Sequence, residues 1–370
     1  MSLFQTLRAR FKKFTKKKKI LLLSLLGLVA IFSLAAGFYL GLNGNFGRIL
    51  SPIGTLLENK PPEPRDFPNP INGVLYTKSE AAKWKDRLPL AVVLENHTDA
   101  RPQSGLSKAE AVYEVLAEGG ITRFLALYLA EDSILGPVRS NRTYFLDWLS
   151  EYKAGYAHIG GSPEAQARVK EFNISDLDQF FLGAPTYTRI ANRFAPHNVY
   201  TTTDKLRGAA DSRGYRGPVK LESWLFKDEE SSASARPKKF ELTLKFRENA
   251  PYVVDWKYNR EKNLYLRFNG GASHIDKETN SQLSAKTIIV QEVIITPDPS
   301  GHSRIRIKTV GSGPVRIFQD GKVISGKWKK TSRTGRTRFF DNKGAEIAFN
   351  RGQIWIEIIP AGSPVIIKKN

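Results

Sequence analysis

The feature that most constrains this chain is an uncharged apolar run of 23 residues, Ile20 to Leu42, with the sequence ILLLSLLGLVAIFSLAAGFYLGL. A helix rises about 1.5 Å per residue, so a helix of that length spans a hydrocarbon core of roughly 30 Å. Eight lysine or arginine residues and no acid precede the run. The positive-inside rule then predicts a basic cytoplasmic segment over 1–19, a single-pass transmembrane helix over 20–42 in the cell membrane, and an extracytoplasmic remainder.

A cleaved signal peptide is the alternative interpretation of the same run. Ala35, Ala36 and Gly37 supply small residues that would permit cleavage. The run is longer than the usual signal core of about 7–15 residues, which favours an uncleaved anchor. The chain has no cysteine, so disulfides, thiolate chemistry, cysteine zinc sites and a lipid on cysteine are excluded.

The charge of the chain is strongly basic, with a formal net charge of +21. After residue 42 there are still 49 basic against 36 acidic residues. Such a surface attracts polyanions. With the bulk of the chain outside the membrane, lipid headgroups and anionic wall polymers are better candidates than nucleic acid, and we expect no nucleic-acid partner. The alternative is that the excess charge only aids solubility.

Composition shifts divide the rest of the chain. Nine Gly or Pro residues between 43 and 70 indicate a spacer, and the polar stretch KDEESSASARPKK indicates a linker. We expect an α+β protein with these parts: a Pro/Gly-rich spacer over 43–70, an α/β domain over 71–226, a linker over 227–239 and an antiparallel β-rich domain over 240–370.

Strand and helix signals alternate in the predicted α/β domain. Apolar runs predict strands at 90–95, 121–130 and 155–159. A capping box from Ser107 to Glu110 predicts a helix that ends at Gly119 and Gly120. Further helices are expected over 140–153, from Ser162 and over 203–213. After residue 239, short alternating runs divided by turn residues predict an antiparallel sandwich or a partly closed barrel.

Two carboxylates on the predicted helix are candidate catalytic groups. Glu114 and Glu118 lie four residues apart and would share a helix face. At the helix C-terminus the dipole favours a protonated Glu118, and a raised pKa suits the general acid of a glycoside hydrolase. Glu95 and Asp99, after a predicted strand, could supply the second carboxylate. The alternative is a solvated carboxylate that forms an ion pair with a basic neighbour such as Arg123.

The segment GPVRSNR places two guanidinium groups at a predicted helix start, where an anion would bind. We take Arg139 and Arg142, together with Arg123, as candidate ligand contacts. The alternative is that these arginines pack on aromatic rings or pair with nearby acids.

Histidines supply the last candidates. His158 ends a predicted strand and His197 lies in a loop after Pro196, so both are expected to line a cleft. Ser162 follows Gly160 and Gly161, but the segment lacks the last glycine of G-x-S-x-G, so an N-cap explains it better than a nucleophile. The five histidines show no metal-ligand spacing, and we expect neither a metal site nor a cofactor.

These segments, in this order, resemble the YerB-like family of bacterial envelope proteins, which carries a domain of unknown function. The N-terminal resemblance lies in RPQSGLSKAEAVYEVLAEGGITRFLALY, GPVRSNR, HIGGSPEA and APHNVY. The C-terminal resemblance lies in Trp328 to Gly344 and in GQIWIEIIP. The resemblance implies an N-terminal α/β domain, a C-terminal β domain and an extracytoplasmic location. Members can be lipoproteins attached through a cysteine, which this chain lacks.

Two functions follow as hypotheses. The first is a membrane-anchored envelope protein that binds or acts on peptidoglycan or an anionic wall glycan; if it is an enzyme, it cleaves glycan. The second is a non-catalytic scaffold or regulator that binds another envelope protein, through an edge of its C-terminal sheet.

Overall fold

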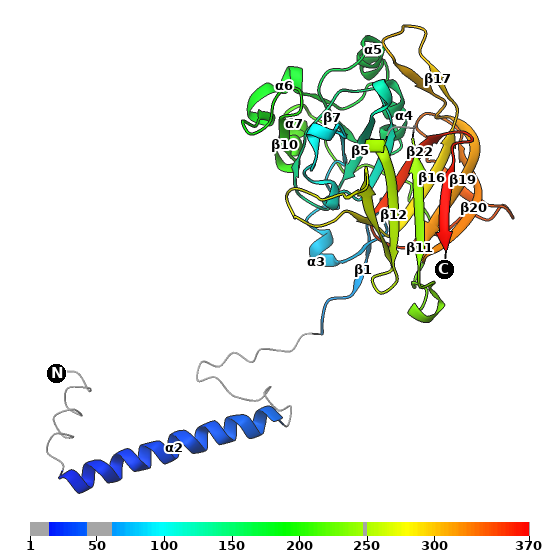
Figure 1. Ribbon diagram of the computed structural model, residues 1–370. Coiled ribbons are helices and arrows are strands. Elements are labelled where there is room, and N and C mark those ends of the chain that lie inside the picture. The colour runs from blue at the N-terminus through cyan, green and yellow to red at the C-terminus, as the bar shows by residue number, and fades with distance from the viewer. Residues whose placement is uncertain (1–14, 43–60, 247–249, 370) are drawn as a thin grey trace. The chain divides into compact units, whose positions relative to one another are not determined.

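The computed structural model describes residues 15–42, 61–246 and 250–369. The chain divides into two compact units, residues 1–62 and residues 63–370. The first unit contains helix α2 (Lys16–Leu42) (Figure 1). Of the predicted basic segment and spacer, residues 1–14 and 43–60 lie outside the described residues.

The expected transmembrane helix is not found. Helix α2 covers the predicted segment, but within the described parts of the chain no helix combines the length and the apolarity that a membrane span needs. The prediction of a single-pass helix over 20–42 is therefore wrong.

The second unit is built on strands, and its α-helices have only four to ten residues (Figure 1). Ten strands form one mixed sheet. In spatial order they are β21 (Arg338–Asp341), β20 (Lys322–Lys330), β19 (Gly311–Gln319), β16 (Thr287–Val293), β22 (Ile354–Pro360), β4 (Ala111–Leu116), β5 (Thr122–Tyr128), β3 (Leu90–Glu95), β7 (Gly155–His158) and β8 (Asp176–Asp178).

A second sheet of six strands is wholly antiparallel and packs against one face of the first. Its strands are β14 (Ala272–Ser273), β13 (Leu264–Asn269), β12 (Val253–Asn259), β11 (Phe240–Lys245) and β23 (Val365–Lys369), with β15 (Ser284–Ala285) paired to β13. Burial alternates along β11 and β13, as expected for strands with one face on the core.

Short elements complete the unit. The small sheets pair β1 (Arg65–Pro68) with β2 (Leu75–Thr77), β17 (Ile295–Pro297) with β18 (Ile305–Ile307), and β10 (Val199–Thr202) with both β6 (Ile134–Leu135) and β9 (Thr188–Arg189). The α-helices are α3 (Lys78–Ala81), α4 (Thr143–Ser150), α5 (Pro163–Glu171), α6 (Gln179–Thr186) and α7 (Thr203–Ser212). The single 3₁₀ turns are η2 (Thr98–Ala100), η3 (Leu106–Lys108), η4 (Glu118–Gly120), η5 (Ala233–Ala235) and η6 (Ala250–Tyr252).

The predicted fold class, an α/β domain followed by an antiparallel β domain, is wrong. Strands from the two predicted domains form one sheet. Strand β22 pairs in parallel with β16 on one side and with β4 on the other, with Ile356 opposite Ile289 and Tyr113. One sheet therefore contains strands from both sides of the linker expected over 227–239. Six of the seven residues of β22 are buried, which is typical of a central strand covered on both faces.

Both faces of the large sheet carry a hydrophobic core. On one face lie residues of the six-stranded sheet and of α7, and there Trp256 meets Trp355 edge to face with the ring centroids 5.3 Å apart. On the other face lie aromatic residues of α4, including Phe145 and Trp148.

Local predictions have mixed outcomes. The strand predicted over 90–95 is β3, and Ser162 caps α5 by accepting a hydrogen bond from the N–H of Ala165. The helix predicted from Ser107 to Gly119 is wrong, because residues 111–116 form β4. The expected capping box does not form, because the carboxylate of Glu110 accepts hydrogen bonds from the N–H groups of Leu129 and Ala130.

Candidate functional site

Polar side chains gather at one edge of the ten-stranded sheet, where β3, β4, β7 and β8 end. These strands run in the same direction, with β5 antiparallel between β3 and β4. Strands β3 and β7 pair only as far as Val92 and Ala157. Beyond that point the segment 137–141 lies between them: the N–H of Arg139 donates to the carbonyl of Val93 (2.8 Å), and its own carbonyl accepts from Ile159 (3.0 Å). Strand ends that separate in this way form the usual crevice for a ligand in such sheets.

Glu95, the last residue of β3, links two of the predicted ligand contacts. Its Oε1 accepts from the Nε of Arg139 at 3.0 Å, and its Oε2 lies 2.9 Å from the Nδ1 of His197. The Glu95 side chain is buried, whereas Arg139 and His197 are partly exposed. Folding therefore brings Arg139 and His197 together on a residue that the sequence suggested only as a second carboxylate.

Glu118 lies in a separate cluster with the two other predicted arginines. Arg142 donates from Nε and Nη2 to its two carboxylate oxygens, and the Nη1 of Arg123 lies 3.4 Å from Oε2. Burial by itself raises the pKa of Glu118. The hydrogen bond from Arg142 and the charge of Arg123 outweigh burial, so the pKa lies below its ordinary value of 4.5. The expected raised pKa is wrong, because Glu118 follows a strand and no helix dipole acts on it.

Glu114 is fully buried and does not share a face with Glu118, since it lies in the middle of β4. Its carboxylate accepts from the Nη2 of Arg267 and from the Oγ1 of Thr122 (2.6 Å). Arg267 also donates to Glu357 at 3.0 Å. Glu114 is thus part of a buried ion-pair network that joins β4 and β22 to β13.

His158 ends β7, as expected, but its side chain is fully buried. Its Nδ1 lies 2.9 Å from the carbonyl of Gly160, and its Nε2 lies 3.0 Å from Oδ1 of Asp176. His158 is therefore fixed by contacts inside the protein rather than exposed at the edge of the sheet.

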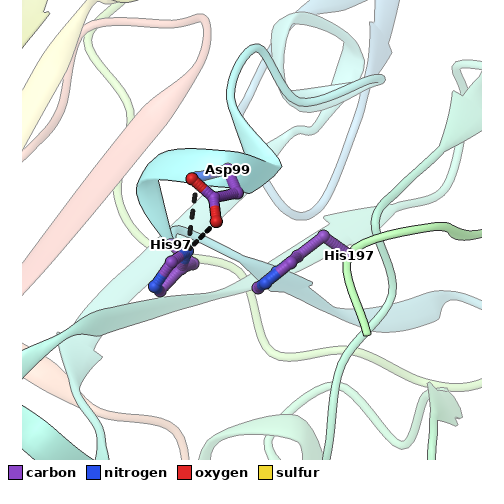
Figure 2. Close-up of side chains that lie close together, drawn as sticks. All are labelled: His97, Asp99 and His197. Atoms are coloured by element: carbon purple, nitrogen blue, oxygen red, sulfur yellow. Dashed lines mark hydrogen bonds and ion pairs between the residues drawn. The ribbon is translucent and has the colours of Figure 1, made fainter. Parts of the chain in front are cut away.

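A cluster that the sequence did not predict lies where His197 meets the turn after β3. His97, Asp99 and His197 each offer a ligand atom, and these atoms all lie within 4.8 Å of one another (Figure 2). The rings of His97 and His197 are stacked, with centroids 4.7 Å apart. The only signal in the sequence is a histidine and an aspartate two residues apart after a strand, which is weak.

A pocket of about 520 Å³ opens next to this cluster. Its lining comes from three places: residues 98–102, Ala250 and Pro251 of η6, and residues of β13, β14 and the segment that follows them. Arg101 lines it, held by hydrogen bonds from Nε and Nη2 to the side chain and carbonyl of Asn96 (both 3.1 Å). Sequence reasoning missed Arg101, because the rest of the pocket comes from residues between 250 and 275, far away in the chain.

Arg193 holds the two loops of this region against each other. It donates from Nη1 to the carbonyl of Asp99 (3.2 Å) and from Nη2 to the carbonyl of Pro102 (2.7 Å). The loop that carries His197 is thereby joined to the turn that carries His97, Asp99 and Arg101.

Comparison with known proteins places these features in one family. Residues 76–216 match the N-terminal domain, and residues 242–356 the C-terminal domain, of a protein family of unknown function designated DUF3048. The chain is 32% identical over 283 residues to "Putative lipoprotein YerB" of Bacillus subtilis (strain 168), covering 75% of this chain and 83% of that protein. The crystal structure of YerB from Bacillus subtilis superposes with a TM-score of 0.74 at 30% identity, covering 82% of this chain and 100% of that one.

Proposed function

We propose that this chain, which belongs to the DUF3048 family, is a cell-envelope protein that binds peptidoglycan or another anionic wall glycan without cleaving it. A relative described as a lipoprotein supports a place in the envelope. The family description states no function, so we infer the ligand from the chemistry of the site.

The observation that carries the proposal is the composition of the pocket. Its lining includes Arg101 and no acidic residue; the other lining residues are polar or apolar, such as Asn269, Ser273 and Pro251. A fixed guanidinium that faces no acid within the pocket suits a carboxylate or a phosphate. Neutral polar and apolar walls suit the hydroxyl groups and the carbon faces of sugar rings.

The charge of the chain supports an acidic ligand. After residue 42 the chain holds 49 basic and 36 acidic residues, so an anionic polymer is attracted over the whole surface as well as at Arg101. Binding of this kind weakens as salt screens the charges.

We do not propose that the protein cleaves glycan, because the carboxylates expected to perform the cleavage are held in ion pairs with arginines. Glu118 is paired with two arginines, and its pKa is lowered where a general acid needs a raised one. Glu114 is buried against Arg267. Neither group is free to protonate a leaving oxygen.

The test is co-sedimentation of the full-length chain with purified cell wall at low salt. We expect the protein to pellet with the wall, to release no soluble sugar, and to bind less well to wall stripped of its anionic polymers. Arg101→Ala should weaken binding about tenfold, whereas Arg213→Ala, which removes an exposed arginine outside the pocket, should not. Protein that stays in the supernatant with every wall preparation would overturn the proposal.

A scaffold that binds another envelope protein is the second candidate, and exposed aromatic side chains favour it. Phe180 and Phe181 on α6 and Phe194 in the loop before β10 are all largely exposed. Exposed aromatic groups often mark protein-binding surfaces. A Phe180→Ser, Phe181→Ser variant that retains wall binding but loses co-purifying envelope proteins would favour the scaffold.

A further inference from the structure

The cluster of His97, Asp99 and His197 has no part in the binding pocket proposed above, yet it has the composition of a metal centre. His97 and Asp99 come from the turn after β3, and His197 comes from the loop before β10. In Figure 2 the two imidazole rings and the carboxylate, which come from these two segments, lie beside one another, and one ligand atom of each lies within 4.8 Å of the others.

His197 is held in the orientation that a metal ligand needs. Glu95 is buried and accepts a hydrogen bond from Arg139, and its Oε2 lies 2.9 Å from the Nδ1 of His197. A proton on Nδ1 leaves the lone pair on Nε2 free to bind a cation. A carboxylate behind a ligating histidine is the usual supporting contact in metal sites, because it fixes the tautomer and the ring orientation.

His97 and Asp99 are spaced as two ligands of one ion. The Nδ1 of His97 lies 3.6 Å from Oδ2 of Asp99. Bonds of about 2.0–2.1 Å in a tetrahedral site place neighbouring ligand atoms about 3.4 Å apart. The N–H of Asp99 donates to the same Nδ1 at 3.2 Å, and this hydrogen bond gives way when a metal ion takes the lone pair.

The exposure of the three side chains indicates an open site. The His197 side chain is 16% exposed, His97 36% and Asp99 69%, so an ion can enter from solvent. Three protein ligands leave a fourth tetrahedral position for water or for a bound molecule. Thr98, between the two ligands in sequence, lines the pocket, so that position would lie near the pocket.

We propose that His97, Asp99 and His197 bind one divalent transition-metal ion of the Zn²⁺ class, with Glu95 as the supporting carboxylate. Two imidazoles and one carboxylate suit Zn²⁺ better than Ca²⁺ or Mg²⁺, which prefer oxygen ligands. The charge of Glu95 offsets that of Arg139, which donates a hydrogen bond to it. The site is independent of wall binding and does not require it.

The test is Zn²⁺ binding by the full-length chain after treatment with EDTA, measured by competition with a chromophoric chelator. We expect one Zn²⁺ per chain. His97→Ala and His197→Ala should each weaken binding by at least about tenfold, Asp99→Asn by about tenfold, and Glu95→Gln by about 10–100-fold. His302→Ala, which removes an exposed histidine outside the cluster, should bind as the unaltered chain does.

A second measurement separates loss of the site from loss of folding. Thermal unfolding in EDTA should be the same for the unaltered chain and for His97→Ala, and added Zn²⁺ should raise the melting temperature of the unaltered chain alone. If His197→Ala fails to fold, His97→Ala and Asp99→Asn decide the question. Zn²⁺ binding that is absent, or that is equally strong in the His97→Ala, His197→Ala double variant, overturns the proposal.

Discussion

Glu95 and His197 are 102 residues apart in the chain, and a hydrogen bond of 2.9 Å joins them. The contact ties the end of β3 to the loop before β10, and through Arg139 it extends to the segment that lies between β3 and β7. The stability of this edge of the sheet and the position of the His197 ring therefore depend on the same carboxylate.

The coupling between Glu95 and His197 can be measured with a double-mutant cycle. Glu95→Gln and His197→Ala should each destabilise the protein, and the double variant should be less destabilised than the sum by about 0.5–3 kcal/mol, because the two residues are in contact. Urea unfolding of the four proteins gives the free energies. Strict additivity would mean that the contact contributes nothing to stability.

Glu118→Gln tests whether this residue is a structural ion-pair partner. Loss of the carboxylate leaves Arg123, which is nearly buried, without its charge partner, so we expect a loss of about 1–3 kcal/mol of stability. Wall binding should be unchanged. The matched control is Glu131→Gln, which removes an exposed pair with Lys108 and should cost less than about 1 kcal/mol.

The pH dependence of the same pair has a definite sign. Because the pKa of Glu118 in the folded protein lies below 4.5, its stabilising contribution is complete above about pH 4.5 and is lost as the pH falls through the folded-state pKa. The stability difference between the unaltered chain and Glu118→Gln should thus be constant at neutral pH and shrink in acid. A difference that grows in acid would contradict the assignment.

Arg267→Ala should be the most destabilising of these changes. Arg267 is fully buried between Glu114 and Glu357, and its removal leaves two carboxylates buried without a cation. We expect a loss of about 3–5 kcal/mol, measured by urea unfolding. Arg338→Ala, which breaks a pair with exposed Glu222 and a partly buried pair with Glu346, is the control and should cost about 1 kcal/mol or less.

Ser162→Ala separates a helix cap from a catalytic residue. The hydroxyl of Ser162 accepts from the N–H of Ala165 at 3.3 Å, so its loss should cost about 0.5–2 kcal/mol. Wall binding and Zn²⁺ binding should both be unaffected. A variant of unchanged stability that fails to bind wall would give Ser162 a functional role after all.

Sequence reasoning failed where a local pattern was compatible with two structures. Residues 107–116 carry a capping-box signal and apolar residues at helical spacing, but they also contain Val112 and Val115, which suit a strand. Tertiary packing decided the outcome. Residues 111–116 are buried on both faces between β22 and β5, and the side chain of Glu110 caps neighbouring backbone N–H groups instead of its own helix.

The sequence by itself determined the local elements whose signals are short-range, such as the strand at 90–95 and the N-cap at Ser162, and it carried the family resemblance. Only the tertiary structure decided that β22 joins β4 in parallel, and that His97, Asp99 and His197 meet. The reason is physical. A helix cap depends on residues that are neighbours in sequence. The strand pairing and the meeting of the three side chains depend on how segments that are far apart in sequence pack over a shared core, and the local sequence pattern does not encode that packing.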